Sequence, residues 1–300
     1  MQSDYRAGTL TLVLLAVSTG LWINLLRQGF SNGWSWPLQP RRDVPWRAWE
    51  AVGAVLIVLI CVGAVLHQLT GSSEAARESS GQVMQPVPTR IIDVEPDSGR
   101  APASPESSAA DLRKLQFFAI SQLAELALIP LILGIWCSCR WEDFGLRRHG
   151  LKTELQFALW GMLLAQLPVH VLEYPIQTWR AEDPHPMLEL LKNSTNLWET
   201  VPWIAVEVIV LAPLVEELLF RVVLQGALER EIPARWAVIL TAAAFACIHQ
   251  TADWLPLFPL ALILGYVYYR RRSYVAVVVL HGLFNAASLL AALFITKIIP

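Results

Sequence analysis

The sequence is short of charged residues. Only 16% of its 300 residues are Asp, Glu, Lys or Arg, whereas a soluble domain carries roughly a quarter. The formal net charge is −2, so the basic excess that marks nucleic-acid-binding proteins is missing. We therefore expect neither an ordinary soluble domain nor a nucleic-acid partner.

Cysteine is scarce as well. The four cysteines lie in or beside apolar stretches, without a CxxC pair or the spacing of a disulfide framework. They are Cys61, Cys137, Cys139 and Cys247. The His-Glu-xx-His motif of zinc peptidases is also missing. We interpret these cysteines as small packing residues and predict no structural zinc site.

Long apolar runs are what the sequence has in abundance. Hydrophobic residues make up 55% of the chain, and a bilayer is crossed by about 20 helical residues. The apolar blocks are Thr9–Leu26, Trp49–Leu69, Leu115–Cys137, Glu154–Val171, Val201–Leu224, Trp236–His249, Leu255–Tyr269 and Tyr274–Phe294. A membrane barrel would show short alternating strands instead. The sequence thus predicts an all-α integral membrane protein with about eight transmembrane helices.

One segment breaks this pattern. Gly71–Asp111 is rich in Ser, Pro, Ala and Glu and poor in aromatic residues, so it cannot bury enough apolar surface to offset its ordering entropy. We predict three parts: a two-helix membrane region over 1–70, a disordered Ser/Pro/acidic loop over 71–112, and a six-helix core over 113–300.

The orientation follows from Lys and Arg in the short loops, which favour the cytoplasmic side. These residues are concentrated after the first, third, fifth and seventh blocks, as in Arg270-Arg271-Arg272. Alternation over eight helices therefore predicts that both termini are non-cytoplasmic.

The fifth block carries three ionisable groups. Glu216, Glu217 and Arg221 would each cost roughly 2.5–3.5 kcal/mol at the bilayer centre. Glu217 and Arg221 are spaced i, i+4 and can form an ion pair, whereas Glu216 projects about 100° away and has no partner on its own helix. Pro213, one turn earlier, should kink the helix.

Two later blocks carry histidines. Phe245 and His249 lie one turn apart, and so do His281 and Asn285, which therefore share a helix face. Gly282 would let another helix approach closely. A glutamate in a water-poor cavity can act as a base for water, and His and Asn can stabilise an oxyanion. The set indicates hydrolysis.

These motifs resemble the signature of the CPBP family of intramembrane peptidases, which includes type II CAAX prenyl endopeptidases and bacteriocin-processing or immunity (ABI) proteins. The matching residues are Glu216-Glu217-xxx-Arg221, Phe245-xxx-His249 and His281-xxx-Asn285. The resemblance covers about the last 160 residues, from a lead-in at Asp143–Arg148. It implies a CAAX-protease-like helical core and a multi-pass protein of the bacterial plasma membrane.

The resemblance also implies roles. Glu216 would activate water that His249 holds, His281 and Asn285 would form the oxyanion hole, and Glu217 with Arg221 would support the site. We expect no cofactor. Zinc is the alternative, and Glu216, His249 and His281 would then supply its ligands. The expected partners are the lipid bilayer and a membrane-associated protein or peptide substrate.

Other functions stay open at this point. A non-catalytic membrane partner or immunity protein could use the same fold to bind a peptide. A proton-coupled transporter could use intramembrane Glu and His as a relay, although no inverted repeat is visible. The sequence does not define the substrate, its prenylation or the oligomeric state. Depth is a further question: by helical rise, Glu216 and His281 lie about 10 Å from the cytoplasmic ends of their blocks and His249 about 20 Å.

Overall fold

The protein is helical throughout the part of the chain that the structure describes. The computed structural model describes residues 2–32, 43–79, 105–146, 150–179, 197–249 and 254–295. Within these ranges the regular elements are helices and none is a strand. The all-α prediction is confirmed.

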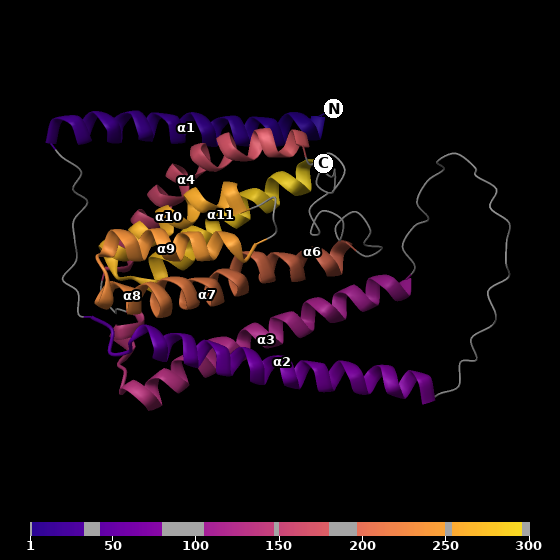
Figure 1. Cartoon of the computed structure of the whole chain (residues 1–300). Coiled ribbons are helices and arrows are strands. Elements are labelled where there is room, and N and C mark those ends of the chain that lie inside the picture. Colours follow the sequence, from indigo (N-terminus) through magenta and orange to yellow (C-terminus); the bar gives the residue numbers. More distant parts are fainter. Residues whose placement is uncertain are drawn as a thin grey trace.

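The helices group into eight rods within the described ranges (Figure 1). Four are single helices: α1 (Gln2–Asn32), α2 (Ala48–Ser79), α3 (Pro105–Cys137) and α4 (Leu151–Trp179). The fifth rod is a continuous run of α6 (Leu197–Val206), η2 (Glu207–Leu211), α7 (Ala212–Glu217), η3 (Leu218–Gln225) and α8 (Gly226–Glu231). The last three are α9 (Ala234–Cys247), α10 (Trp254–Arg271) and α11 (Tyr274–Ile295), and a short 3-10 turn, η1 (Trp141–Phe144), follows α3. Each rod contains one of the predicted apolar blocks.

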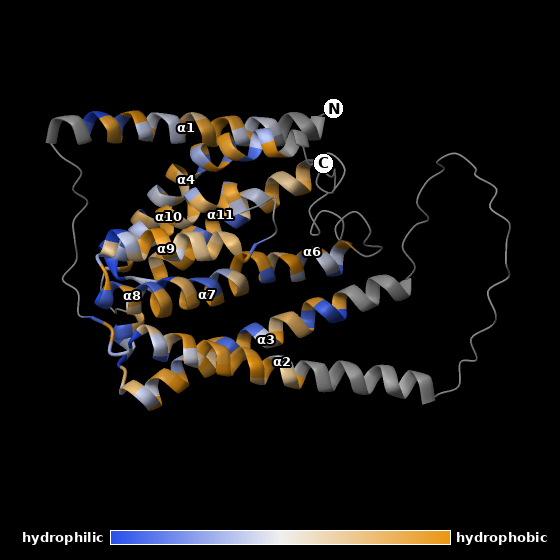
Figure 2. Ribbon diagram, in the orientation of Figure 1, coloured by the Kyte–Doolittle hydropathy of each residue, from blue (hydrophilic) through white to orange (hydrophobic). Residues whose placement is uncertain are grey.

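Five of the eight described rods have the length and surface of membrane helices; the fifth rod, α9 and α10 are not among the candidate spans. Five stretches are long and apolar enough to cross a bilayer: Gly8–Gln28, Ala48–Val65, Leu112–Cys137, Leu151–Ile176 and Tyr274–Phe294. Large apolar side chains on their outer faces are exposed, as lipid contact requires. Hydrophilic residues gather at the end of the bundle where α2 begins and α8 lies (Figure 2). The protein is a multi-pass membrane protein.

The start of α1 and the end of α11 lie at the same end of the bundle (Figure 1). An even number of crossings produces this arrangement. The side of the membrane on which that end lies stays a prediction from the charged loops.

The helices reach further into the segment predicted as a disordered loop than the sequence suggested. α2 continues to Ser79 and α3 begins at Pro105, so both ends of the predicted 71–112 loop are helical. The run Glu74-Ala-Ala-Arg-Glu78 consists of good helix formers, which explains why α2 extends beyond its apolar block. Residues 80–104 lie outside the described ranges.

The fifth rod also runs past its predicted end at Leu224, to Glu231. Glu216 is therefore 15 residues from the end of this rod (231 − 216), about 22 Å along the axis. His249 is likewise 15 residues from the start of α9 at Ala234 (249 − 234). The extension gives Glu216 and His249 the same separation from the ends of their rods, whereas His281 is still seven residues from the start of α11 (281 − 274).

Two tryptophans attach the N-terminal rods to the core by donating hydrogen bonds to backbone carbonyls of core helices. Pro168 has no N–H to donate to the Leu164 carbonyl, and the Trp22 indole Nε1 donates to it at 2.9 Å. Trp46, which is fully buried, donates from Nε1 to the Val223 carbonyl at 3.0 Å. Both carbonyls belong to core rods, so the region 1–70 is packed onto the core that it precedes.

Candidate active site

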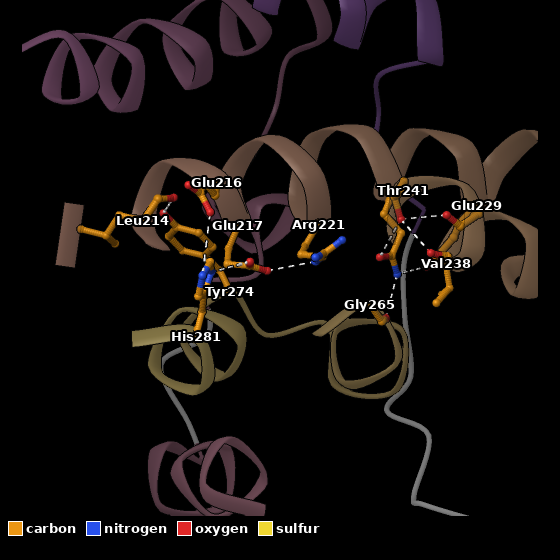
Figure 3. Close-up of polar contacts among 12 residues, drawn as sticks. Leu214, Glu216, Glu217, Arg221, Glu229, Val238, Thr241, Gly265, Tyr274 and His281 are labelled. Atoms are coloured by element: carbon orange, nitrogen blue, oxygen red, sulfur yellow. Dashed lines mark hydrogen bonds and ion pairs between the residues drawn. The ribbon is translucent and has the colours of Figure 1, made fainter. Parts of the chain in front are cut away.

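Glu217 is the centre of a buried polar cluster between α7 and α11 (Figure 3). Its Oε2 accepts a hydrogen bond from Arg221 Nε at 3.0 Å, which confirms the predicted i, i+4 ion pair. Its Oε1 lies 3.0 Å from His281 Nδ1. Glu217 is completely buried and His281 nearly so. One carboxylate therefore fixes both the guanidinium on its own rod and the imidazole on the last helix.

Arg221 is held almost wholly by this carboxylate. It is completely buried, its guanidinium lies 5.1 Å from the Phe245 ring centroid, and Nη1 and Nη2 make no hydrogen bond within the described residues. A buried cation with one anionic partner depends strongly on that partner. Phe245, the first residue of the predicted Phe-xxx-His motif, therefore packs against the Arg221 guanidinium.

Glu216 points to the other nitrogen of the same imidazole. Its Oε2 lies 3.8 Å from His281 Nε2, and 24% of its side chain is exposed. Glu216 is thus the more accessible of the two adjacent acids and the less tightly bound. This arrangement confirms the sequence argument that Glu216, unlike Glu217, has no partner on its own helix.

His249 lies in the turn that follows α9, two residues beyond the end of the helix at Cys247. Its Nδ1 is 2.7 Å from the Phe245 carbonyl oxygen, and its ring is 4.7 Å from the Phe245 ring, which is in turn 5.8 Å from the His281 ring. The three rings place His249 beside the cluster. Among the described residues, His249 and Glu216 form no ion pair within 4.0 Å of each other.

Asn285 is on the His281 face of α11 as predicted, but its amide has a partner already. Its Nδ2 donates to the Val208 carbonyl at 2.9 Å. In the π-helical turn η2, the Ala212 N–H bonds to the Glu207 carbonyl. The next N–H would come from Pro213, which has none. Val208 therefore lacks a backbone donor, and Asn285 supplies one.

The close approach of α11 to η2 depends on Gly282. A Cβ at this position would meet the Ile209 carbonyl oxygen at 2.6 Å, closer than real Cβ contacts. Ile209 is four residues before Pro213, so the proline again removes the N–H that α-helical bonding would bring to this oxygen. The predicted role of Gly282 in helix approach is confirmed.

Further bonds lock the surrounding helices. The Tyr274 hydroxyl donates to the Leu214 carbonyl at 2.5 Å. Gln225, completely buried, donates from Nε2 to Glu229 Oε1 at 2.8 Å and to the Gly265 carbonyl at 2.9 Å. Figure 3 shows this second network one or two turns along the same rod from Glu217. The rod that carries the acids is therefore tied to α10 and α11 on both sides of them.

Sequence reasoning did not single out Glu207, an acid inside the fifth rod. Glu207 is 5% exposed, and neither of its carboxylate oxygens makes a hydrogen bond within the described residues. Its neighbour Gln122, on α3, is equally buried with an unbonded Oε1. An acid inside the fifth apolar block is itself a sequence signal, because a buried charge in a membrane is costly. Glu207 belongs to none of the three motifs, so motif matching did not select it.

The possible zinc ligands do not converge. Within the described ranges, no group of three His, Cys, Asp or Glu residues lies close enough to hold a metal ion. Of the set Glu216, His249 and His281, both histidines have Nδ1 committed, to the Phe245 carbonyl and to Glu217. Their Nε2 atoms stay available, as in metal-bound histidines whose other nitrogen is hydrogen-bonded, so zinc remains the alternative and we derive no step through a metal.

Comparison with known proteins agrees with this geometry. Residues 198–287 match the model of the family described as type II CAAX prenyl endopeptidase Rce1-like. This stretch is similar to an Rce1-like domain. It begins in α6 and ends within α11, so it contains the Glu216–Arg221, Phe245–His249 and His281–Asn285 motifs. The match indicates an intramembrane protease of the CAAX type, consistent with the CPBP family. No curated protein and no solved structure matches the chain.

Proposed function

We propose that this protein is an intramembrane endopeptidase that hydrolyses a peptide bond of a membrane-associated protein or peptide, with Glu216 as the base. The observation that carries the proposal is that the two adjacent acids differ in their contacts and in their exposure. Glu217 is fixed by Arg221 and His281, whereas Glu216 is partly exposed and lies 3.8 Å from His281 Nε2. A base must reach water, and Glu216 is the acid that can.

In the proposed reaction, Glu216 accepts a proton from a water molecule that His249 helps to hold. The resulting hydroxide attacks the carbonyl carbon of the scissile bond, and the carbonyl oxygen becomes an oxyanion. When the intermediate collapses, the C–N bond breaks and the proton on Glu216 passes to the leaving nitrogen. The products are a carboxylic acid and an amine, and Glu216 is regenerated.

His281 is the proposed donor to the oxyanion. An Nδ1–H hydrogen bond to Glu217 orients the ring and leaves Nε2 facing Glu216 and the space beside it. Both ring nitrogens carry a hydrogen only in the imidazolium form, and in that form the Nε2–H in a water-poor site is an effective donor to a developing negative charge. Asn285 has a second amide hydrogen beyond the one used for Val208, and we assign it to the same oxyanion. Glu217 and Arg221 act through His281 as positioning residues.

The test uses the purified full chain and a peptide ending in a farnesylated CAAX motif, with the unprenylated peptide beside it. Glu216→Gln and His281→Ala should each lower the rate of cleavage at least 100-fold, and both variants should stay folded. Arg235→Gln, an exposed change outside the site, is the control. Cleavage that is unaffected by either site variant would exclude the proposed base and oxyanion donor. Peptide that binds but is never cut by the unmodified chain would favour the non-catalytic partner instead.

Metal dependence has its own test. We expect a membrane-permeant chelator to leave cleavage unchanged, because the donor set does not converge. Loss of activity that added zinc restores would overturn this expectation.

A further inference from the structure

A pocket separate from the Glu216 cluster opens near the ends of α3 and α10. Its volume is about 270 Å³. The lining residues are Val44, Arg140, Glu142, Asp143, Gly145, Tyr268 and Arg272. They come from three places in the chain: the segment before α2, the η1 turn with the residues that flank it, and the end of α10 with its connection to α11. The volume fits a small polar group better than a drug-sized ligand, whose pockets start at about 300 Å³.

Arg272 forms part of the wall in an unfavourable backbone conformation. Its φ is +47°, a left-handed position that costs a non-glycine residue about 1–2 kcal/mol. The residue is 5% exposed. Nη2 lies 3.1 Å from Glu229 Oε2, yet none of the three guanidinium nitrogens makes a well-formed hydrogen bond within the described residues. Arg272 directly follows the last residue of α10 and its N–H bonds to the Tyr268 carbonyl at 2.7 Å, so the left-handed conformation ends this helix and places the side chain in the pocket wall.

Gly145 forms part of the opposite wall and packs closely against the α10–α11 connection. Its φ is +74°, and a Cβ there would meet the Tyr274 nitrogen at 2.8 Å. The Tyr274 N–H donates to the Gly145 carbonyl at 3.2 Å. The Ser273 hydroxyl accepts from the Ala276 N–H at 3.2 Å and so caps α11. Backbone bonds thus build the pocket, independently of any ligand.

The outer rim carries one cation and one anion without partners. Arg140 and Glu142 lie two residues apart and are exposed, and neither side chain forms an ion pair within the described ranges. Asp143 is already occupied, because its Oδ2 accepts from the Arg140 N–H at 2.8 Å. The pocket lining therefore includes an exposed positive group and an exposed negative group, and the wall holds Arg272 with its counter-charge Glu229.

The pocket also lies at the depth of a membrane interface. The lining residues of η1 follow the apolar span that ends at Cys137, and Arg272 precedes the span that begins at Tyr274. Trp141, in the same η1 turn, is 70% exposed, as expected of an aromatic anchor among headgroups.

We propose that this pocket binds the zwitterionic headgroup of an aminophospholipid, a phosphodiester that carries a primary ammonium. The phosphate lies against Arg140, with the Arg272 charge behind it, and the ammonium donates to the Glu142 carboxylate. A choline headgroup has no N–H to donate to Glu142, and a purely anionic headgroup leaves Glu142 facing a negative charge. The pocket therefore prefers ethanolamine to both.

The experiment titrates the full chain in detergent with short-chain phosphatidylethanolamine, phosphatidylglycerol and phosphatidylcholine, and counts bound lipid by native mass spectrometry. Arg140→Gln and Glu142→Gln should each weaken ethanolamine-lipid binding about tenfold, the effect of one charge-assisted hydrogen bond. Arg235→Gln and Glu199→Gln remove exposed charges outside the pocket and should leave binding unchanged. Melting temperatures of all four variants verify that each is folded.

Additional ligands test whether the pocket recognises the whole headgroup or only its phosphate. Soluble glycerophosphoethanolamine should compete with the lipid, whereas inorganic phosphate should compete far less. Equal binding of phosphatidylglycerol, unchanged by Glu142→Gln, would overturn the zwitterionic assignment. Unchanged ethanolamine-lipid binding in both pocket variants would overturn the site itself. Neither result bears on cleavage by the Glu216 site.

Discussion

His281 Nδ1 lies 3.0 Å from Glu217 Oε1, and this contact joins the last helix to the rod that carries both acids. The other oxygen of the same carboxylate binds Arg221. The ion pair that looked local in the sequence is therefore also an interhelical connection. It sets the ring of His281 so that Nε2 faces Glu216.

Glu217→Gln should destabilise the fold more than Glu216→Gln. The change leaves the completely buried Arg221 without a counter-charge, which costs about 3–5 kcal/mol for a buried pair. Glu216 is partly exposed and has no comparable partner, so its amide variant should unfold within a few degrees of the unmodified chain. Thermal unfolding of both variants in one detergent measures the difference. Equal melting temperatures would show that Arg221 does not depend on Glu217.

Asn285→Ala should lower stability as well as activity. It removes the donor that serves the Val208 carbonyl, and a buried acceptor left without a partner costs about 1–3 kcal/mol. Asn285→Gln keeps the amide but moves it by one methylene, so it should recover part of either property. If Asn285→Ala melts like the unmodified chain and only cleavage falls, Asn285 serves the oxyanion alone.

Gly282→Ala tests the contact between α11 and η2. The added methyl would meet the Ile209 carbonyl oxygen at 2.6 Å, and the backbone cannot move away without separating Asn285 from Val208. We expect a clear loss of thermal stability. Gly134→Ala is the matched control, because nothing lies within 4 Å of a Cβ at that helical glycine. Alanine there should be neutral or should stabilise by up to about 1 kcal/mol.

Glu207→Gln should be tolerated or should stabilise the protein. The carboxylate is buried and neither oxygen makes a hydrogen bond among the described residues, and the Gln122 Oε1 beside it also has none. An amide at position 207 removes the cost of burying a charge and brings N–H donors to that oxygen. Thermal unfolding and cleavage are both measured. A loss of stability as large as that of Glu217→Gln would show that the charge of Glu207 is needed.

The sequence predicted the helices well and the contacts between them only in part. The apolar blocks identified all eight rods, of which five contain a stretch long and apolar enough to cross a bilayer, and the i, i+4 spacing identified the Glu217–Arg221 pair. The Glu217–His281 and Asn285–Val208 bonds join residues 64 and 77 positions apart, so no local pattern reports them. The π-helical turns η2 and η3 have no sequence signal beyond Pro213, yet η2 decides that the Val208 carbonyl needs Asn285.

The orientation in the membrane is the prediction with the widest reach. The Arg-rich turns after α3 and α10 place the pocket end of the bundle in the cytoplasm, and the start of α1 and the end of α11 then lie outside. Cysteines introduced singly at Ser72, at the far end of α2, and at Ser138, at the pocket end, test this in a chain whose four native cysteines are replaced by alanine. In intact cells an impermeant maleimide should label position 72 and not position 138, and permeabilised cells should label both. Labelling of position 138 alone would reverse the topology. The lipid pocket would then face the outer leaflet, and the headgroup that reaches it would be the one that leaflet contains.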